Sequence, residues 1–162
     1  MRTLAAFAAL FLFAACQAPP TDEMTEADYD QIVTSVMDRT DEMMAAWNAY
    51  DLDAAMSFFD PDKTSFAWGS TIYDFNSLKQ HWGEIWAAGD RQEVSWTGRN
   101  IEVLSESAVL FQGSFELTFF YSDGRVGHWP GTAHWTVLME LHNGNWQITY
   151  GGYSYGSAQT TQ

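Results

Sequence analysis

Five polar side chains that could hold or act on a small molecule interrupt apolar stretches in the second half of the chain: Arg99, Gln112, Ser114, Glu116 and Tyr150. A carboxylate among apolar groups has a raised pKa and can serve as a general base, and a guanidinium or a phenol can polarise a substrate oxygen. The residue types therefore predict one of two arrangements. Either Glu116 is a catalytic base with Tyr150 and Arg99 as polarising groups, or Arg99 and Glu116 form a structural ion pair at the mouth of a pocket.

Hairpin turns decide whether these residues share one face of a sheet. Asp123-Gly124 and Asn143-Gly144 are dipeptides typical of two-residue hairpin turns, and Ser105-Glu106 separates the preceding pair of apolar stretches. Turns of this length predict the following opposed pairs: Arg99 and Gln112, Gln112 and Trp135, Val137 and Tyr150. The side chains that share a face depend on this register, because a slip of one residue reverses every face.

This register gives the sheet one mixed face and one aromatic face. The mixed face combines the polar residues with aliphatic ones, and convergent polar groups in an apolar concavity make a ligand pocket. The aromatic face carries Trp96, Phe111, Phe115, Leu117, His134, Thr136 and Tyr153. Because a soluble monomer rarely exposes so large an aromatic patch, we expect the mixed face to be concave, under the helices, and the aromatic convex face to form a homodimer interface. Gly127, Pro130 and Gly131 predict a bulge near the start of the third long strand.

Eight tryptophans offer flat surfaces on which a flat or cyclic ligand can stack, or ring faces that can attract a cation. Trp47, Trp82 and Trp146 fit simple core positions. Trp68 and Trp86 flank the ends of a predicted helix and a hairpin, where a pocket would open, and are better pocket candidates. The predicted ligand-binding set is Trp68, Tyr73, Trp86, Arg99, Gln112, Ser114, Trp135 and Tyr150.

Spacing and charge argue against other kinds of chemistry. The four histidines show no H-x-H or H-E-x-x-H spacing, so no metal site is predicted. The sequence has neither a G-x-S-x-G nucleophile elbow nor a glycine-rich phosphate loop, and no cofactor is expected. With 7 basic and 21 acidic residues and a net charge of −14, the chain would repel nucleic acid.

Helices precede strands along the chain. Apolar residues recur every three or four positions between Glu26 and Tyr50, which is the pattern of an amphipathic helix. Asp51 and Asp74 are natural N-caps for a short helix ending near Phe59 and a longer helix over 75–88. The segments that alternate like strands are a small hairpin at 64–73 and four long strands at 93–104, 107–121, 131–141 and 146–155. The order predicts an α+β domain over 26–156, with three N-terminal helices packed on a strongly curved antiparallel sheet.

Three segments carry a resemblance to a known superfamily: AAWNAYDLDAAMSFF at 45–59, the hairpin from Trp68-Gly69 to Tyr73, and HNGNWQITYGGYS at 142–154. With the element order, they resemble the nuclear transport factor 2-like superfamily and its SnoaL-like, cystatin-like cones. The resemblance implies a cone fold. It leaves function open, since the superfamily includes isomerases, dehydratases and cyclases that use a pocket carboxylate or histidine, and also domains that only bind or assemble.

Three hypotheses follow for the folded domain. The first is a domain of the cell envelope that binds a small hydrophobic or aromatic ligand without catalysis, favoured because no complete catalytic constellation is present. The second is a cofactor-free isomerase, dehydratase or cyclase that uses Glu116 or a pocket histidine as base. The third is a structural assembly domain, which would be favoured if the cone proved to be filled by its own tryptophans.

The first 16 residues predict where the protein works. Arg2, an apolar run over 4–15 and two small residues before Cys16 follow the order of a secretory signal and resemble the lipobox of bacterial lipoproteins. We therefore expect residues 1–15 to be removed, Cys16 to be acylated and anchored in the membrane, and 16–25 to be a flexible tether. Gln17, which is not aspartate, favours the outer membrane, facing the periplasm, by resemblance to the lipoprotein sorting rule. Residues 157–162 are expected to form a disordered tail.

Overall fold

The computed structural model describes residues 24–88, 91–121, 123–128 and 132–155. The predicted signal peptide, the acylated Cys16, nearly all of the tether and the C-terminal tail lie outside the described residues. No helix within the described ranges is long and apolar enough to cross a membrane.

The three helices begin at polar caps. Helix α1 (Glu26–Asn48) starts with a capping box, in which the Thr25 side chain accepts from the Asp28 backbone N–H and the Asp28 carboxylate accepts from the Thr25 N–H. Asp51 caps α2 (Leu52–Met56), which ends three residues before the predicted Phe59. Asp74 accepts from the Ser77 N–H at the start of α3 (Phe75–Ala88). The predicted helices and caps at Asp51 and Asp74 are confirmed.

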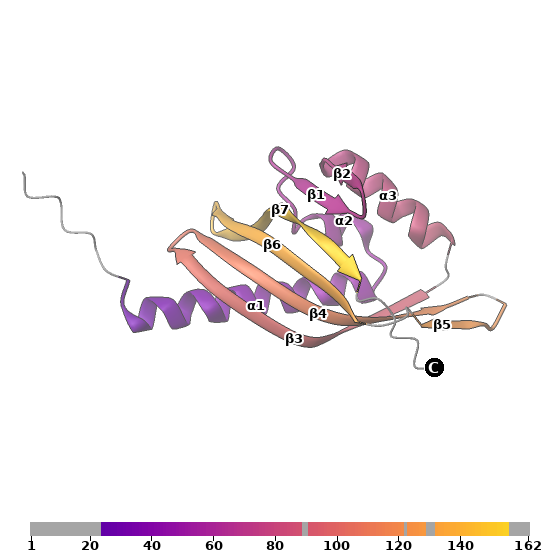
Figure 1. Cartoon of the computed structure of the whole chain (residues 1–162), viewed down its shortest axis with the longest axis horizontal. Helices are drawn as coiled ribbons and strands as arrows, with labels where there is room; N and C mark the ends of the chain where they lie inside the picture. The colour runs from indigo at the N-terminus through magenta and orange to yellow at the C-terminus, as the bar shows by residue number, and fades with distance from the viewer. Residues whose placement is uncertain (1–23, 89–90, 122, 129–131, 156–162) are drawn as a thin grey trace, which may run out of the picture.

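The strands form one curved, seven-stranded sheet in the order β2-β1-β7-β6-β4-β3, with β5 paired to β4. They are β1 (Ser65–Trp68), β2 (Thr71–Tyr73), β3 (Arg91–Ser105), β4 (Ala108–Phe120), β5 (Val126–His128), β6 (Ala133–His142) and β7 (Asn145–Tyr155). The β1–β2 hairpin joins the edge of the main sheet through parallel pairing of β1 with β7, so the sheet is mixed, whereas an antiparallel one was predicted. Figure 1 shows α1 running along the sheet and α3 beside the hairpin at one end.

The predicted register is wrong over much of the sheet, for a different reason at each pair of strands. Asn143 and Gly144, both with positive φ, do form the expected two-residue turn, but Thr149 is an extra residue in β7 opposite the Leu138–Met139 step. Beyond this bulge Trp135 pairs with Tyr153. Between β3 and β4 the turn falls at Glu106-Ser107 rather than at Ser105-Glu106, so that Asn100, rather than Arg99, lies opposite Gln112. The extra residue Thr97 then restores the predicted register from Trp96 to Arg91. A bulge adds one residue to one strand and shifts the register beyond it.

The turn at Asp123-Gly124 also differs from expectation, because it leads into the short strand β5 rather than into β6. Strand β6 starts at Ala133 and takes its own register against β4, with Gln112 opposite Thr136. The bulge expected around Gly127, Pro130 and Gly131 falls partly outside the described residues, since 129–131 are not among them.

These shifts exchange the predicted faces of β4 and of the end of β7, whereas β6 keeps Trp135 inside and His134 and Thr136 outside, as predicted. The aromatic face is the buried, concave one, with Phe111, Phe115, Leu117, Trp135 and Tyr153 each at most 7% exposed. The convex face carries the polar residues Gln112, Glu116, His134, Thr136 and Tyr150, all of them exposed. The aromatic convex patch that suggested a dimer is absent from the described strands, so the homodimer remains a prediction without that support.

Candidate ligand-binding cavity

Tryptophans from both long helices and from the sheet meet inside the cone. Trp47 on α1 packs edge to face against Trp82 and Trp86 on α3, with ring centroids 4.2 and 5.4 Å apart, and against Trp135 on β6 at 5.9 Å. Trp47 is 5% and Trp82 4% exposed. Trp146, 5% exposed, donates its indole N–H to Ser35 Oγ at 2.9 Å. The core positions predicted for Trp47, Trp82 and Trp146 are confirmed.

A small cavity remains between these rings and the sheet. Its volume is about 20 Å³, which is room for about one water molecule. Its lining residues come from α1, α3 and four strands: Met43, Met44, Trp47, Trp82, Gln92, Val94, Trp96, Phe115, Leu117, Trp135 and Tyr153. The interior of the cone is therefore filled almost completely by its own aromatic side chains.

Gln92 is the unusual member of this lining. Its side chain is 1% exposed, and neither its amide nitrogen nor its amide oxygen has a hydrogen-bond partner in the described structure. Leaving a buried polar group unpaired costs about 1–3 kcal/mol, so native proteins rarely keep one without a reason. Sequence reasoning missed Gln92, although a glutamine at the same alternating positions as Val94 and Trp96 was a readable signal.

Two methionines form the helical wall of the cavity. Met43, 1% exposed, and Met44, half-buried, extend from α1. Methionine side chains are unbranched and fill irregular spaces adaptably. This wall can yield to a molecule larger than one water more readily than the aromatic walls can.

The predicted catalytic residues do not come together. Glu116 is exposed on the convex face, opposite Ser95 in β3, and Tyr150 is 62% exposed. Arg99 instead bonds to α1, with Nη1 2.6 Å from Asp41 Oδ1. The predicted inward placement of Glu116 and Tyr150, and the Arg99–Glu116 ion pair, are therefore wrong. Strand β4 pairs with β6 one residue away from the predicted register, which puts Glu116 outside, and the extra residue Thr149 does the same to Tyr150.

Of the predicted ligand-binding residues, Trp135 lines the cavity. Gln112 and Ser114 lie on the convex face, where Gln112 accepts from Asn100 and Ser114 bonds to His134.

The other aromatic members of the set lie near α3 but outside the cavity lining. Tyr73 stacks on His81 with ring centroids 4.8 Å apart, and Trp68 meets the same imidazole edge to face at 4.6 Å. Trp86 is 8% exposed and packs against Trp47 and Tyr50. These contacts make Trp86 part of the packed core.

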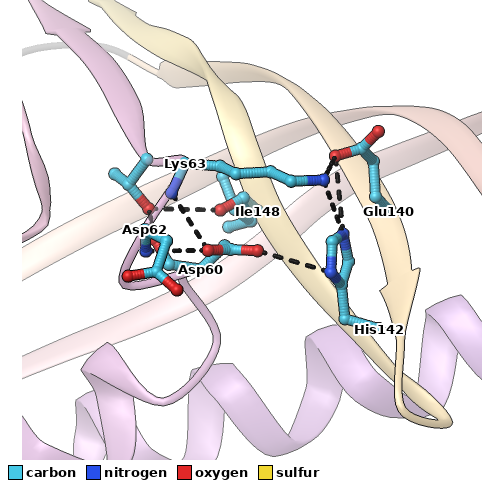
Figure 2. A network of polar contacts seen from close by, with 7 residues as sticks. Asp60, Asp62, Lys63, Glu140, His142 and Ile148 are labelled. Atoms are coloured by element: carbon cyan, nitrogen blue, oxygen red, sulfur yellow. Dashed lines mark hydrogen bonds and ion pairs between the residues drawn. The ribbon is translucent and has the colours of Figure 1, made fainter.

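An ionic cluster ties the loop before β1 to β6 (Figure 2). Asp60, 5% exposed, accepts the backbone N–H groups of Asp62 and Lys63 and lies 3.5 Å from the His142 ring. Lys63 Nζ donates to Glu140 at 3.2 Å, and this hydrogen bond and charge hold the pKa of Glu140 below its usual value. Every bond described here joins one part of the cluster to another, so its evident role is to fasten the loop to the sheet.

Two larger hollows are open to solvent. One, of about 590 Å³, lies between α1 and the β6–β7 turn and has a rim of carboxylates, and the other, of about 490 Å³, lies on the convex face around Gly98 and Gly113. The lining of the first includes no unpartnered buried polar side chain, and that of the second includes only Trp135, which also lines the interior cavity. Within the described residues, no three His, Cys, Asp or Glu side chains are grouped to hold a metal ion.

Comparison with solved structures identifies the architecture. A candidate scytalone dehydratase from Novosphingobium aromaticivorans superposes with a TM-score of 0.73 at 8% identity, over 82% of this chain and 89% of that one. The hexachlorocyclohexane dehydrochlorinase LinA-type3 from Novosphingobium barchaimii gives 0.67 at 12% identity, over 82% and 91%. A nuclear transport factor 2-like protein of unknown function from Shewanella oneidensis gives 0.61 at 19% identity, over 76% and 98%. The chain has the nuclear transport factor 2-like fold.

The predicted superfamily resemblance and α+β cone are thereby confirmed at the level of fold. No family model and no curated protein sequence matches the chain. In this nuclear transport factor 2-like cone, the lining of the interior cavity includes neither a carboxylate nor an imidazole. The phenol of Tyr153 is the lining group of a type that takes part in acid–base catalysis.

Proposed function

We propose that this protein is a lipid-anchored domain of the bacterial cell envelope that binds a small apolar or aromatic molecule inside its cone without transforming it. The observation that carries the proposal is the buried Gln92 carboxamide, unpartnered and lining a cavity among tryptophans. A bound molecule with a polar edge would satisfy the amide and stack its apolar part on the rings.

A purely structural role is the second candidate, because the cone is nearly filled by its own side chains. Gln92 argues against it. A core selected only for packing would gain stability from an apolar side chain at this position, since the amide has no partner to lose. The adaptable wall formed by Met43 and Met44 provides a route by which the cavity can enlarge.

A cofactor-free isomerase, dehydratase or cyclase gains no support from the geometry. Glu116, the expected base, lies on the far face of the sheet, and the dehydratase and dehydrochlorinase named above share the fold at 8–12% identity. Fold alone does not carry an activity from one protein to another.

The proposed location in the envelope, most simply the outer membrane facing the periplasm, rests on the acylation of Cys16 that the sequence predicts. The tether from Gln17 to Thr25 can span at most about 30 Å when extended, so the cone would stay close to the bilayer. Several acyl chains on one residue anchor a protein stably, whereas one chain binds reversibly. A Cys16→Ala variant should appear in the soluble fraction rather than with the membranes, and wild-type protein in the soluble fraction would contradict the anchor.

Native mass spectrometry of the full-length protein, extracted from its own membranes in mild detergent, tests the binding proposal. We expect a retained small molecule on the wild type, and much less of it on Gln92→Leu, because that variant loses the only carboxamide in the cavity lining. Gln112→Leu is the matched control, since Gln112 lies on the convex face. A wild-type chain that carries no adduct, or equal adducts on all three proteins, would contradict the proposal.

A further inference from the structure

We infer that the molecule bound in the cone is a neutral, flat hydrogen-bond acceptor, such as a ring that carries a carbonyl oxygen. This inference rests on the proposed binding function and narrows the class of ligand.

The polar atoms around the cavity are mostly donors. Trp47, Trp96 and Trp135 line it, and the indole nitrogen of each is buried without a hydrogen-bond partner in the described structure. An indole N–H can only donate. Gln92 adds a carboxamide, with two N–H donors and one acceptor oxygen, and it too is unpartnered. A ligand that satisfies this set must therefore supply acceptor oxygens or nitrogens.

The absence of charge in the lining selects a neutral acceptor. None of the lining residues is ionisable at neutral pH, so neither an anion nor a cation would find a counter-charge there. Burying an unpaired charge is far more costly than burying a neutral polar group. The net charge of −14 further disfavours an anion. A cation would in addition meet N–H groups that present it with positive charge.

The walls select a flat shape. Indole and phenyl rings from α1, α3, β3, β4 and β6 line the cavity, and planar ligands stack on such rings. The volume of about 20 Å³ is too small for a ring unless a wall moves. Met43 and Met44 form the wall that can move, so the ring is expected to enter against α1, with its oxygen towards Gln92 and the indole N–H groups.

Three matched bicyclic compounds test the proposed class of ligand on the full-length protein in detergent. They are 1-indanone, which carries a carbonyl, indane, which has no polar atom, and 1-aminoindane, which is a cation at neutral pH. We expect calorimetry to show 1-indanone binding about tenfold more tightly than indane, as one or two new hydrogen bonds would give. The amine should bind more weakly than either. In ¹⁵N–¹H spectra, 1-indanone should move the indole N–H signals of Trp47, Trp96 and Trp135 downfield.

Conservative substitutions test whether the indole N–H groups of the cavity account for the tighter binding of 1-indanone. Trp135→Phe keeps an aromatic ring but removes one donor, so it should weaken 1-indanone and leave indane nearly unchanged. Trp68→Phe is the control, because Trp68 does not line the cavity.

The outcomes separate this inference from the proposed function. Equal affinities for 1-indanone and indane would overturn the acceptor class while leaving an apolar binding site in place. Binding of neither compound would overturn both. If 1-indanone binds but the indole N–H signals do not move, the ligand is not accepting hydrogen bonds from these groups, and the acceptor class would also be overturned. Unmoved, upfield signals would show that the indole N–H groups point at the faces of neighbouring rings instead.

Discussion

The two faces of the sheet differ in whether their polar groups have hydrogen-bond partners. On the convex face, Asn100 donates to Gln112 and Ser114 bonds to His134, and the exposed groups can also reach water. On the concave face, the carboxamide of Gln92 and the indole N–H of Trp135 are buried without partners. Polar side chains are more numerous on the convex face, but the unsatisfied ones are inside, and unsatisfied groups are the better guide to a binding site.

The two faces should differ most in how much the free energy of unfolding falls when an aromatic side chain is removed from each. Trp135→Ala should lower the free energy of unfolding by about 3–5 kcal/mol, as for other large-to-alanine changes in a core, because this ring contacts those of Trp47, Phe66, Trp96 and Phe115. Tyr150→Ala, on an exposed side chain, should change it by no more than about 0.5 kcal/mol. Urea unfolding measures both, and similar losses would contradict the assignment of the faces.

A methyl group added to neighbouring strands sharpens the same comparison. At Gly113 a Cβ atom would lie 2.8 Å from Phe111 Cε1 and closer still to the Trp96 ring, so Gly113→Ala should cost about 1–3 kcal/mol. At Gly98, its neighbour one strand away, a Cβ atom would meet nothing within 4 Å. Gly98→Ala should therefore be neutral within about 0.5 kcal/mol. Thermal unfolding distinguishes the two, and a tolerated Gly113→Ala would mean that the rings do not pack over this strand.

The smallest effect concerns the ionic cluster that fastens the loop before β1 to β6. Lys63 lowers the pKa of Glu140 from its ordinary 4.5, so this pair stabilises the fold above that pH and the contribution is lost as the pH falls through the lowered value. Because the Glu140 side chain is 33% exposed, we expect less than about 1 kcal/mol. Glu140→Gln should flatten the acid limb of stability against pH, with Glu116→Gln as an exposed control. Identical curves for the wild type and Glu140→Gln would show that the pair contributes nothing.

Local signals in the sequence predicted the elements but not the faces. Asp51 and Asp74 marked two helix starts, and Asn143-Gly144 marked a turn, because each depends only on nearby backbone groups. The extra residue at Thr149 has no such signature, yet it alone moves Tyr150 from the expected pocket to the surface. A shift of one residue exchanges the two faces, so an undetected bulge is enough to place a site on the wrong side.

The site itself was partly readable. Trp135 was predicted and lines the cavity, while Gln92 was overlooked because it stands just before the predicted start of its strand at Glu93. Its burial follows from Trp47 and Trp82, which close over the concave face from two different helices. Contacts of this kind, between distant parts of the chain, cannot be predicted from the spacing of polar and apolar residues along one strand.

The most direct test of the central claim is the free energy of unfolding of Gln92→Leu, measured on refolded, ligand-free protein beside Gln112→Leu. If Gln92 is buried without partners, leucine removes an unpaired amide at nearly constant volume and should stabilise the chain by about 1 kcal/mol. The Gln112 variant should stay within about 0.5 kcal/mol of the wild type. A loss of stability in Gln92→Leu would show that the amide is hydrogen-bonded in the folded chain, and it would contradict a binding site built on Gln92.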